Sequence, residues 1–388
     1  MSARSLRSKT CSEFDPQCQL LLVSDSSINR MTSTYHKLKR ALLWLPARLY
    51  ELAVRLRVAA YETDYLKAKS LDATVISIGN LTFGGTGKTP MVEYVARYLK
   101  SEDHSVAILT RGYARESSGM KVLNRPAPEA SARKQSYREV GDEPAMLARA
   151  LPEIPIIVDR DRHKAGAWAR NELGSDVLVL DDGYQHLGLA RDLNILLIDA
   201  TDTFGSFEMA PFGRLREPLY GIKRADVVIV TRADRAFDQG QTEAIIKLHC
   251  GAKVPVMYFS SLITELRHLA TGEPYDVKEF TGWKVAVACG IANPEAFADD
   301  LLQVGISIVS ESFFPDHHPF DQADVNAITR AAREAGAEAI VTTEKDAVRL
   351  EGLNYGGDVP IYAARLQLQS DDEVRLKSLL LRTVSRKK

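Results

Sequence analysis

Short apolar runs alternate with helical stretches along the chain from Leu71 onward. The runs are rich in β-branched residues, and segments with helical spacing, such as 91–100 and 162–173, separate them. Continuous apolar strands joined by helices are typical of a mostly parallel sheet with both faces covered. The pattern therefore predicts an α/β domain over residues 62–259, with strands at Thr74–Ile78, Ser105–Leu109, Ile154–Val158, Val177–Leu180, Asn194–Ile198 and Val227–Val230.

This alternation loosens over residues 260–283 and then resumes. Strand-like runs follow, with helical spacing between them, at Lys284–Cys289, Ser307–Ser310, Ala339–Thr342 and Pro360–Tyr362. A chain of 388 residues also exceeds what one hydrophobic core commonly fills. We therefore expect a linker at 260–283 and a second, smaller α/β domain at 284–388.

The N-terminal part has a different pattern. Residues 1–30 are polar and without period, which predicts a disordered leader, and Met31 is an alternative start. In residues 31–61, and most clearly in 36–61, leucines are interspersed with lysines and arginines. Such a basic, apolar-faced segment can lie in a membrane interface, or it can be a helix packed on its own domain and interrupted by Pro46. The segment alone favours neither interpretation.

The overall charge and the cysteines narrow the class of protein. A balance of 50 basic against 51 acidic residues leaves a net charge of -1, which gives no support to a nucleic-acid-binding role. The four cysteines form neither a C-x-x-C pair nor a disulfide framework, which favours a reducing compartment. The sequence has no apolar run of about 20 residues and no secretion signal, so no spanning helix is expected.

A glycine-rich turn follows the first strand of the α/β pattern. Its glycines let backbone N–H groups curl around phosphate oxygens at a helix N-terminus, while Lys88 would reach the β- and γ-phosphates and Thr89 would ligate Mg²⁺. Thr82 stands where the pattern G-x-x-x-x-G-K-[ST] has a glycine. We expect ATP to bind on Thr82, Phe83, Gly84, Gly85, Thr86, Gly87, Lys88, Thr89 and Pro90.

A pair of acids closes another apolar run. Asp181 and Asp182 follow Val177–Leu180, so in a parallel sheet they would face the ligand crevice. An acid there can hold Mg²⁺ and its waters, whereas a lone Asp after a strand is usually part of a turn or a helix cap. Beside a phosphate-binding loop, the metal interpretation is favoured.

Two other classes of protein compete with a kinase. Asp234 fits the guanine-reading N-K-x-D loop of a P-loop GTPase or a metallochaperone-like switch, but Thr231 replaces the asparagine whose amide supplies most of the discrimination. A noncatalytic membrane adaptor would use residues 36–61. The phosphate-binding loop and its acid pair argue against an adaptor.

Further polar motifs accompany the loop and the acid pair. Together with these two elements they occupy Ile78–Pro90, Thr110–Arg115, Val140–Pro144, Asp181–His186, Phe212–Pro218, Phe314–His318 and Thr342–Asp346. The combination resembles the tetraacyldisaccharide 4'-kinase family of lipid A synthesis over about residues 42–364. The resemblance implies phosphorylation of the 4'-hydroxyl of tetraacyldisaccharide 1-phosphate, with ATP and Mg²⁺ as cofactors.

The resemblance also implies a location, namely the cytoplasmic face of the bacterial inner membrane, with the enzyme bound peripherally. Because a tetraacylated glycolipid stays in the bilayer, the basic segment at 36–61 would dock the enzyme on the membrane beside its substrate. This tips the balance toward the membrane interpretation of that segment. Neither a nucleic acid nor a protein partner is expected.

The catalytic roles come from the same resemblance. It implies that Asp142 is the base for the acceptor hydroxyl and that His317 is its partner. On the residues alone, Asp142 would be a helix cap and His317 a solvated loop side chain. Because His317 falls in the second domain and Asp142 in the first, we expect the complete site to form at the domain interface.

The resemblance implies the remaining site residues as well. It places Thr89, Asp181, Asp182 and Glu217 around Mg²⁺ and leaves open which of the acids bind directly. Arg214 and Arg216 would neutralise charge on the transferring phosphate. The sugar and its 1-phosphate would be held by Arg111, Tyr113, Arg115, Arg160, Gln185, His186 and Arg216.

Overall fold

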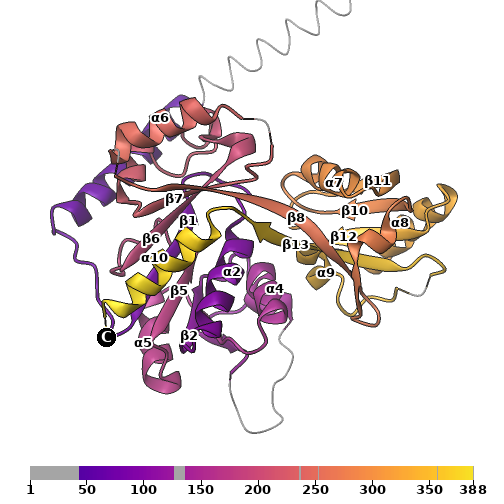
Figure 1. The fold of residues 1–388 in the computed structure, drawn as a ribbon, viewed down its shortest axis with the longest axis horizontal. Coiled ribbons are helices and arrows are strands. Elements are labelled where there is room, and N and C mark those ends of the chain that lie inside the picture. Colours follow the sequence, from indigo (N-terminus) through magenta and orange to yellow (C-terminus); the bar gives the residue numbers. More distant parts are fainter. Residues whose placement is uncertain (1–42, 126–135, 236, 252, 356, 388) are drawn as a thin grey trace, which may run out of the picture.

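The computed structural model describes residues 43–125, 136–235, 237–251, 253–355 and 357–387. The expected leader at 1–30 and the start of the segment at 31–61 lie outside the described residues. Two lobes, joined by a long pair of strands, make up the described chain (Figure 1). One path of hydrogen-bonded strands runs through both lobes.

The first domain is a sheet covered by helices on both faces, as the alternation predicts. Ile76 and Ile78 of the first strand pack in the core under the helix that follows that strand, whereas the neighbouring Val75 packs in the core on the opposite face. The strands are β1 (Thr74–Asn80), β2 (Val106–Thr110), β3 (Lys121–Leu123), β4 (Ile156–Val158), β5 (Val177–Asp181), β6 (Leu193–Asp199) and β7 (Val227–Thr231). Their order in the sheet is β7-β6-β1-β5-β2-β4-β3, parallel except for the pairing of β3 with β4. The helices are α2 (Lys88–Ser101), α3 (Tyr137–Val140), α4 (Asp142–Ala150), α5 (Arg162–Leu173) and α6 (Gln239–Cys250), with short 3-10 turns η1 (Ala200–Asp202), η2 (Gly205–Phe207) and η3 (Leu219–Arg224).

The second domain is a smaller sheet that also carries helices. Its parallel strands are β10 (Lys284–Cys289), β11 (Ser307–Phe313), β12 (Ala339–Thr343) and β13 (Ile361–Gln369), and its helices are α7 (Pro294–Gln303), α8 (Gln322–Glu334) and α9 (Glu344–Arg349). The predicted α/β class with a mostly parallel sheet is confirmed for the chain.

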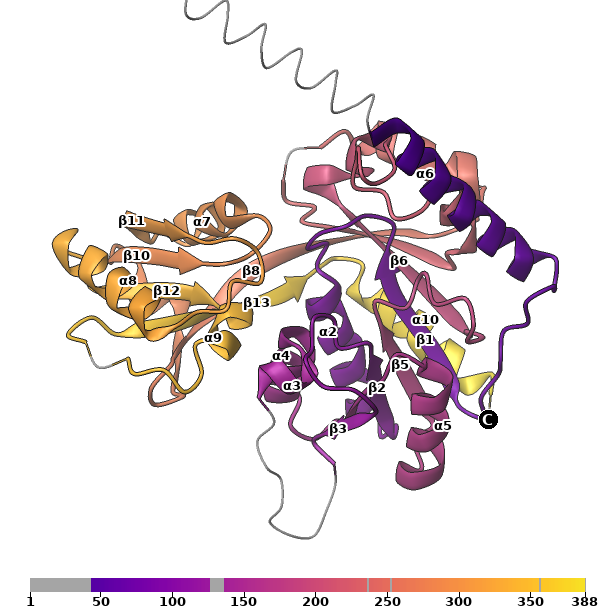
Figure 2. The same cartoon turned by 180° about the vertical axis from the view of Figure 1, so that it is seen from behind.

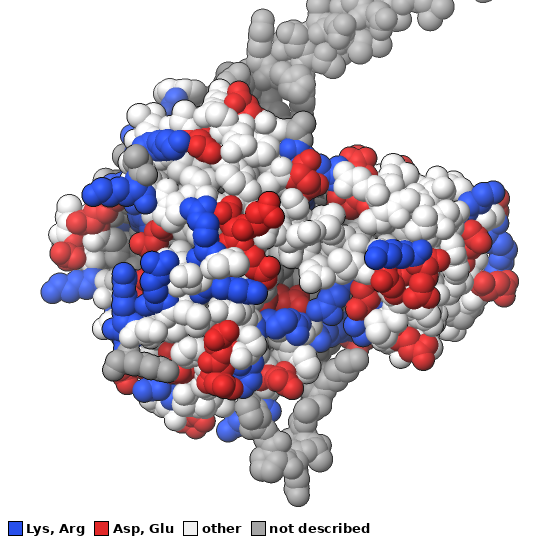
Figure 3. Space-filling model, in the orientation of Figure 1, with Lys and Arg blue, Asp and Glu red and all other residues white. Residues whose placement is uncertain are grey.

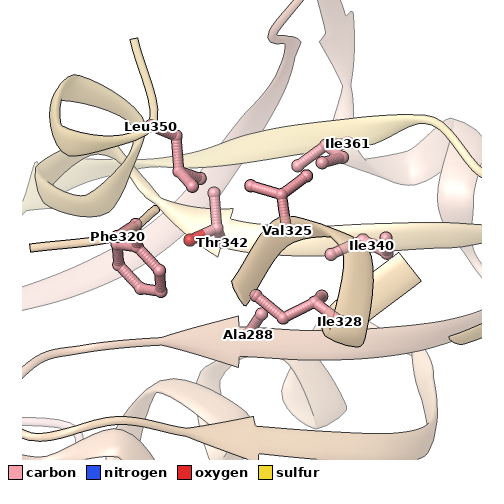
Figure 4. Close-up of a pocket in the computed structure, with 8 residues that line it drawn as sticks. All are labelled: Ala288, Phe320, Val325, Ile328, Ile340, Thr342, Leu350 and Ile361. Carbon is pink, nitrogen blue, oxygen red and sulfur yellow. The ribbon is translucent and has the colours of Figure 1, made fainter. Parts of the chain in front are cut away.

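A small cavity lies inside the core of the second domain (Figure 4). It is lined by Ala288, Phe320, Val325, Ile328, Ile340, Thr342, Leu350 and Ile361. Thr342 is the polar residue among these eight, and its buried hydroxyl has no hydrogen-bond partner among the residues that the structure describes. A cavity with so few polar groups is a gap in core packing and not a binding site.

The segment expected to be a linker is structured differently. Residues Val256–His268 form one strand, β8, which pairs in parallel with β7 at its start and antiparallel with β13 along the rest. The strand contributes Met257 and Phe259 to the core of the first domain, and Ile263 and Leu266 to that of the second. The remainder of 260–283 belongs to the second domain, through β9 (Pro274–Asp276) and η4 (Val277–Phe280). The domains are therefore joined by strands and not by an irregular linker.

The C-terminal boundary also differs from the expectation. Helix α10 (Glu373–Ser385) follows β13 back to the first domain. There Leu376, Leu380 and Val384 are buried in the core beneath α2. The range 284–388 expected for the second domain is thus too long, because its last helix packs on the other core.

A helix at residues 43–62 lies along the outer edge of the first domain, on the side away from the second (Figure 2, indigo). It runs through Pro46 without the interruption expected there. Ala47 and Val58 are buried, whereas Leu45, Leu49, Leu52 and Leu56 are each more than half exposed. In the described part of the chain, no helix has the length and apolarity needed to cross a bilayer.

Candidate active site

The phosphate-binding loop joins β1 to α2. Gly84 and Gly87 have φ values of 113° and 76°, and a Cβ on Gly84 would lie 1.8 Å from Arg214 Nη2. Gly87 is the N-terminal cap of α2, and no side chain in the described part of the chain caps this end of the helix, so its first N–H groups stay open to an anion. Lys88 is buried, and its ammonium lies 3.3 Å from the Gly84 carbonyl. The loop therefore has the backbone conformation that phosphate binding requires.

Thr82 replaces the usual glycine without strain. The φ of Thr82 is not positive, so its side chain causes no backbone strain. It forms an isolated bridge with Leu215, and the next residue, Phe83, donates its N–H to the Arg214 carbonyl at 2.6 Å. Arg214 returns a hydrogen bond from Nε to the Phe83 carbonyl at 2.9 Å. A second strip of chain, 214–216, thus supports the start of the loop.

The acid pair lies beside the loop lysine. Asp181 ends β5, and its Oδ2 accepts a hydrogen bond from Thr110 while its buried Oδ1 has no partner among the described residues. Burial, with the neighbouring charges of Glu143 and Asp182, raises the pKa of Asp181. Asp182 lies 3.9 Å from Lys88 Nζ and accepts two hydrogen bonds from Arg216. Among the described residues, the strand end therefore presents one carboxylate with ion-pair partners, Asp182, and one without, Asp181.

Glu217 is held in a different environment from the one expected of a metal ligand. It is 2% exposed, and both carboxylate oxygens accept from Arg224, at 2.7 and 2.6 Å. Gln185 also donates to Glu217 at 2.8 Å and to the Asn80 carbonyl at 2.7 Å. Gln185 thus links Glu217 to the last residue of β1, and the charge of the Glu217 carboxylate is balanced by Arg224.

Two glycines determine where Asp142 lies. Gly141 has a φ of 98°, and a Cβ there would meet the Tyr113 carbonyl at 2.9 Å. Gly112 has a φ of 66°, and its Cβ would meet the Val140 carbonyl at 2.6 Å. The loop after β2 therefore packs directly on the segment before α4. Asp142 is the first residue of α4 and not its cap.

Asp142 meets His317 across the domain interface. His317 Nδ1 lies 2.8 Å from Asp142 Oδ2, and Lys345 Nζ lies 3.3 Å from the other ring nitrogen, Nε2. A carboxylate only accepts hydrogen bonds, so His317 Nδ1 is the donor in its contact with Asp142. Burial alone would raise the pKa of Asp142, but the hydrogen bond from His317 and the charges of Lys345 and Arg349 hold it well below its usual range. The side chain is therefore an ionised, oriented carboxylate.

The expected substrate residues lie in several environments. Tyr113 is 66% exposed, with its ring 5.9 Å from that of His317. Arg111 is exposed, and Arg115 donates to the Val158 carbonyl at 3.2 Å. His186 is partly buried, and burial next to Arg162 and Arg191 lowers its pKa to about 4. Arg160 is exposed, and its carbonyl accepts a hydrogen bond from Arg162.

Arg162 is a site residue that the sequence reasoning missed. It is 4% exposed, and its Nε has no partner among the described residues. The charges of Asp181, Asp182 and Arg111 all act on its guanidinium, so it lies close to the acid pair. The signal was available, because Arg162 begins a helix that follows the carboxyl end of β4, the edge of the sheet where ligands bind.

The segment weighed as a guanine-reading loop contacts the phosphate loop instead. Thr231 donates its hydroxyl to the Thr86 carbonyl at 3.1 Å, and Arg232 donates to the Gly85 carbonyl at 3.2 Å. The position of the missing asparagine therefore supports the loop backbone. This arrangement does not favour the GTPase alternative.

Comparison with known proteins gives one consistent family. The family described as LpxK, tetraacyldisaccharide-1-P 4'-kinase, matches residues 39–385. The tetraacyldisaccharide 4'-kinase of Geobacter sulfurreducens is 38% identical over 344 residues, covering 89% of this chain and 93% of its own. That of Geobacter metallireducens is 37% identical, with coverage of 89% and 98%.

A solved structure agrees with these sequences. The crystal structure of LpxK from Aquifex aeolicus in complex with ATP superposes with a TM-score of 0.70 at 32% identity, covering 89% of this chain and 99% of that one. The family match and the relatives thus span nearly the whole described chain. The chain belongs to the tetraacyldisaccharide-1-P 4'-kinase family.

Proposed function

We propose that this chain transfers the terminal phosphate of ATP to the 4'-hydroxyl of tetraacyldisaccharide 1-phosphate. One observation carries the proposal: the Asp142–His317 pair forms at the domain interface, and Asp142 lies on α4, which packs against α2, the helix that follows the phosphate-binding loop. A hydrolase would need only water at such a site. An ionised base held between two domains suits an acceptor alcohol that the domains enclose.

The reaction uses the described residues in separate roles. Asp142 accepts the proton of the acceptor hydroxyl as its oxygen bonds to the γ-phosphorus, and the bond from that phosphorus to the β,γ-bridging oxygen breaks to release ADP. Lys88, with the N–H groups at the start of α2, binds the charge that collects on the phosphate oxygens. Arg216 lies beside Asp182, with its guanidinium over the Phe83 ring, and supplies a second cation.

The residues present also fit a magnesium ion. Asp181 Oδ1 is buried without a partner among the described residues, and a divalent cation would give this oxygen a ligand contact. Thr89 and Asp181 would hold the ion, with Asp182 beside it, and Glu217 would act through Gln185 and Arg224 and not as a direct ligand. When bound, the ion would neutralise charge between the β- and γ-phosphates.

The acceptor is an anionic glycolipid, and the positive groups on the same side of the sheet suit it. Arg162 Nε has no partner among the described residues and lies near the acid pair, and Arg111 is close enough to help lower the pKa of Arg162. Tyr113 presents an exposed ring next to His317 for stacking on a sugar. These groups would orient the disaccharide so that its 4'-hydroxyl reaches Asp142.

The direct test is a transfer assay. Purified full-length chain is incubated with γ-³²P-labelled ATP, Mg²⁺ and tetraacyldisaccharide 1-phosphate in detergent micelles, and the lipid is then separated. Label in the lipid fraction that depends on both substrates is the expected result. Release of label only as inorganic phosphate would contradict the proposal.

We further propose that the helix at 43–62 docks the enzyme on the cytoplasmic face of the inner membrane. The double substitution Leu49→Glu with Leu52→Glu is expected to lower partitioning onto anionic vesicles by at least tenfold. Both leucines are more than half exposed on the helix, and burying one Leu side chain contributes about 1.5–3 kcal/mol. Vesicle flotation of the purified protein measures the effect.

Leu248→Glu is the matched control for this test. Leu248 is 79% exposed but lies on α6 and not on the proposed docking helix. We expect it to leave flotation unchanged. Equal flotation of wild type and the double variant would overturn the docking role of the helix.

A further inference from the structure

The second domain contributes a buried arginine to the candidate base. Arg349, at the end of α9, is 2% exposed, and its Nε and Nη2 both donate to Oδ2 of Asp142, the Nε contact measuring 3.1 Å. This is an ion pair between the two domains, formed by a group that the family motifs quoted above do not include. Surface ion pairs contribute little, but a pair this deeply buried constrains both partners.

Hydrogen bonds within the second domain hold the guanidinium of Arg349 in place. Arg349 Nη1 donates to the Gly290 carbonyl at 2.8 Å and to Asp346 Oδ1 at 2.9 Å. Asp346 is in turn held by the Thr343 hydroxyl at 2.7 Å and the Gly290 N–H at 3.1 Å. Nη1 of the planar guanidinium thus bonds within the second domain, whereas Nε and Nη2 bond to Asp142 of the first domain.

The same carbonyl also positions His317. The Gly290 carbonyl accepts from the His317 N–H at 3.2 Å, so one backbone oxygen fixes both the loop that carries the imidazole and the arginine. A side chain at position 290 would meet the Pro315 carbonyl at 3.1 Å and His318 Cβ at 3.2 Å. His317 and Arg349 therefore reach Asp142 as one rigid unit when the domains meet.

The contacts distinguish the two oxygens of Asp142. Oδ2 takes the donors from the second domain, His317 and Arg349. Among the described residues, Oδ1 accepts one hydrogen bond, from the Glu143 N–H at 2.9 Å. A carboxylate oxygen has two lone pairs, so Oδ1 retains one for the proton of the acceptor.

We infer that Arg349 is a positioning residue that holds Asp142 across the domain interface, so that Oδ1 faces the acceptor hydroxyl and the base is competent only while the domains are in contact. The inference rests on the proposed kinase function. Arg349 acts through Asp142 and touches no reacting atom.

Because charged groups surround Asp142, the role of Arg349 can be tested through the pH dependence of the reaction. The charged or titratable groups around it are Glu143 on α4, His317 and Asp316 on the loop after β11, and Lys345, Asp346 and Arg349 on α9. Figure 3 shows basic and acidic side chains interspersed over the face where the domains meet. Removing one cation from this set raises the pKa of Asp142, by about 1–3 units for a charge in direct contact.

The test compares the pH dependence of kcat in Arg349→Met, Arg349→Lys and Arg149→Met. Arg149 is the matched control, because it joins α4 to the Ala347 carbonyl of α9 and to Glu351 in the turn after α9, and none of its contacts within the described part of the chain is with Asp142. For Arg349→Met we expect kcat to fall about 10- to 100-fold, with the acid limb displaced upward by at least about one pH unit and ATP affinity unchanged. Arg149→Met should keep the wild-type acid limb.

The outcomes separate positioning from folding. An unshifted acid limb in Arg349→Met, or an equal shift in Arg149→Met, would overturn the inference. If Arg349→Met does not fold, Arg349→Lys decides, because it keeps the charge but lacks the fork: a loss of kcat with little pH shift supports positioning, and wild-type kcat contradicts it. Absence of lipid phosphorylation by the wild-type chain would instead mean that the proposed function itself has failed.

Discussion

Asp142→Asn is expected to lower kcat by about 10²–10⁴-fold while ATP affinity stays near that of the wild type. The amide has nearly the shape of the carboxylate but cannot take the proton of the acceptor. It also carries no charge to pair with Arg349, so the second-domain unit loses its partner. Initial rates of lipid phosphorylation, together with nucleotide titration, measure the two quantities separately.

A neighbouring histidine supplies the control for this region. His318 pairs with Asp324 at 2.8 Å and stacks on Phe314 within the second domain. His318→Gln is therefore expected to keep wild-type kcat, although it alters the same loop as His317. Near wild-type turnover by Asp142→Asn would remove Asp142 from the role of base.

Lys88→Met is expected to lower kcat by about 10²–10³-fold and to weaken ATP binding as well. The ammonium of Lys88 lies 3.3 Å from the Gly84 carbonyl of the loop and 3.9 Å from Asp182, between the phosphate-binding loop and the acid pair. Its loss also leaves the acid pair with less positive charge nearby, because Lys88 lowers the pKa of both Asp181 and Asp182. Nucleotide affinity and kcat should both fall.

Lys377→Met on α10 provides a comparison with a lysine far from the loop. Lys377 pairs with Glu373 on its own helix. We expect that variant to match the wild type in ATP affinity and in rate. Retention of full activity by Lys88→Met would mean that the loop does not bind the transferred phosphate.

The elements around the site could be predicted from the sequence because their signals are local. The strand β1, the glycine turn and the start of α2 are adjacent along the chain, and each has a residue pattern of its own. Asp181 and Asp182 follow an uninterrupted apolar run, so their place at the edge of the sheet follows from strand geometry alone. Helix α5 has the bounds that its spacing predicts.

The features that the sequence did not predict depend on packing between segments that lie far apart along the chain. Strand β8 changes cores halfway along, so its apolar residues do not keep one alternation, and its second half was interpreted as a linker. Helix α10 has an apolar stripe, but nothing in that stripe indicates which core receives it. The ion pair of Glu217 with Arg224 is a contact that no pattern in the sequence indicates. Arg349 could not be assigned to Asp142, because 207 residues and a domain interface separate them.

The account depends on the backbone between Asn80 and Thr89 holding the triphosphate with its last phosphate turned toward Asp142. A crystal structure of the protein with a nonhydrolysable ATP analogue, Mg²⁺ and the disaccharide lipid measures this directly. We predict that the phosphates lie on the N–H groups at the start of α2, with the 4'-oxygen between the γ-phosphorus and Oδ1 of Asp142. A triphosphate bound elsewhere, or a γ-phosphate separated from Asp142 by the body of either domain, would contradict the account.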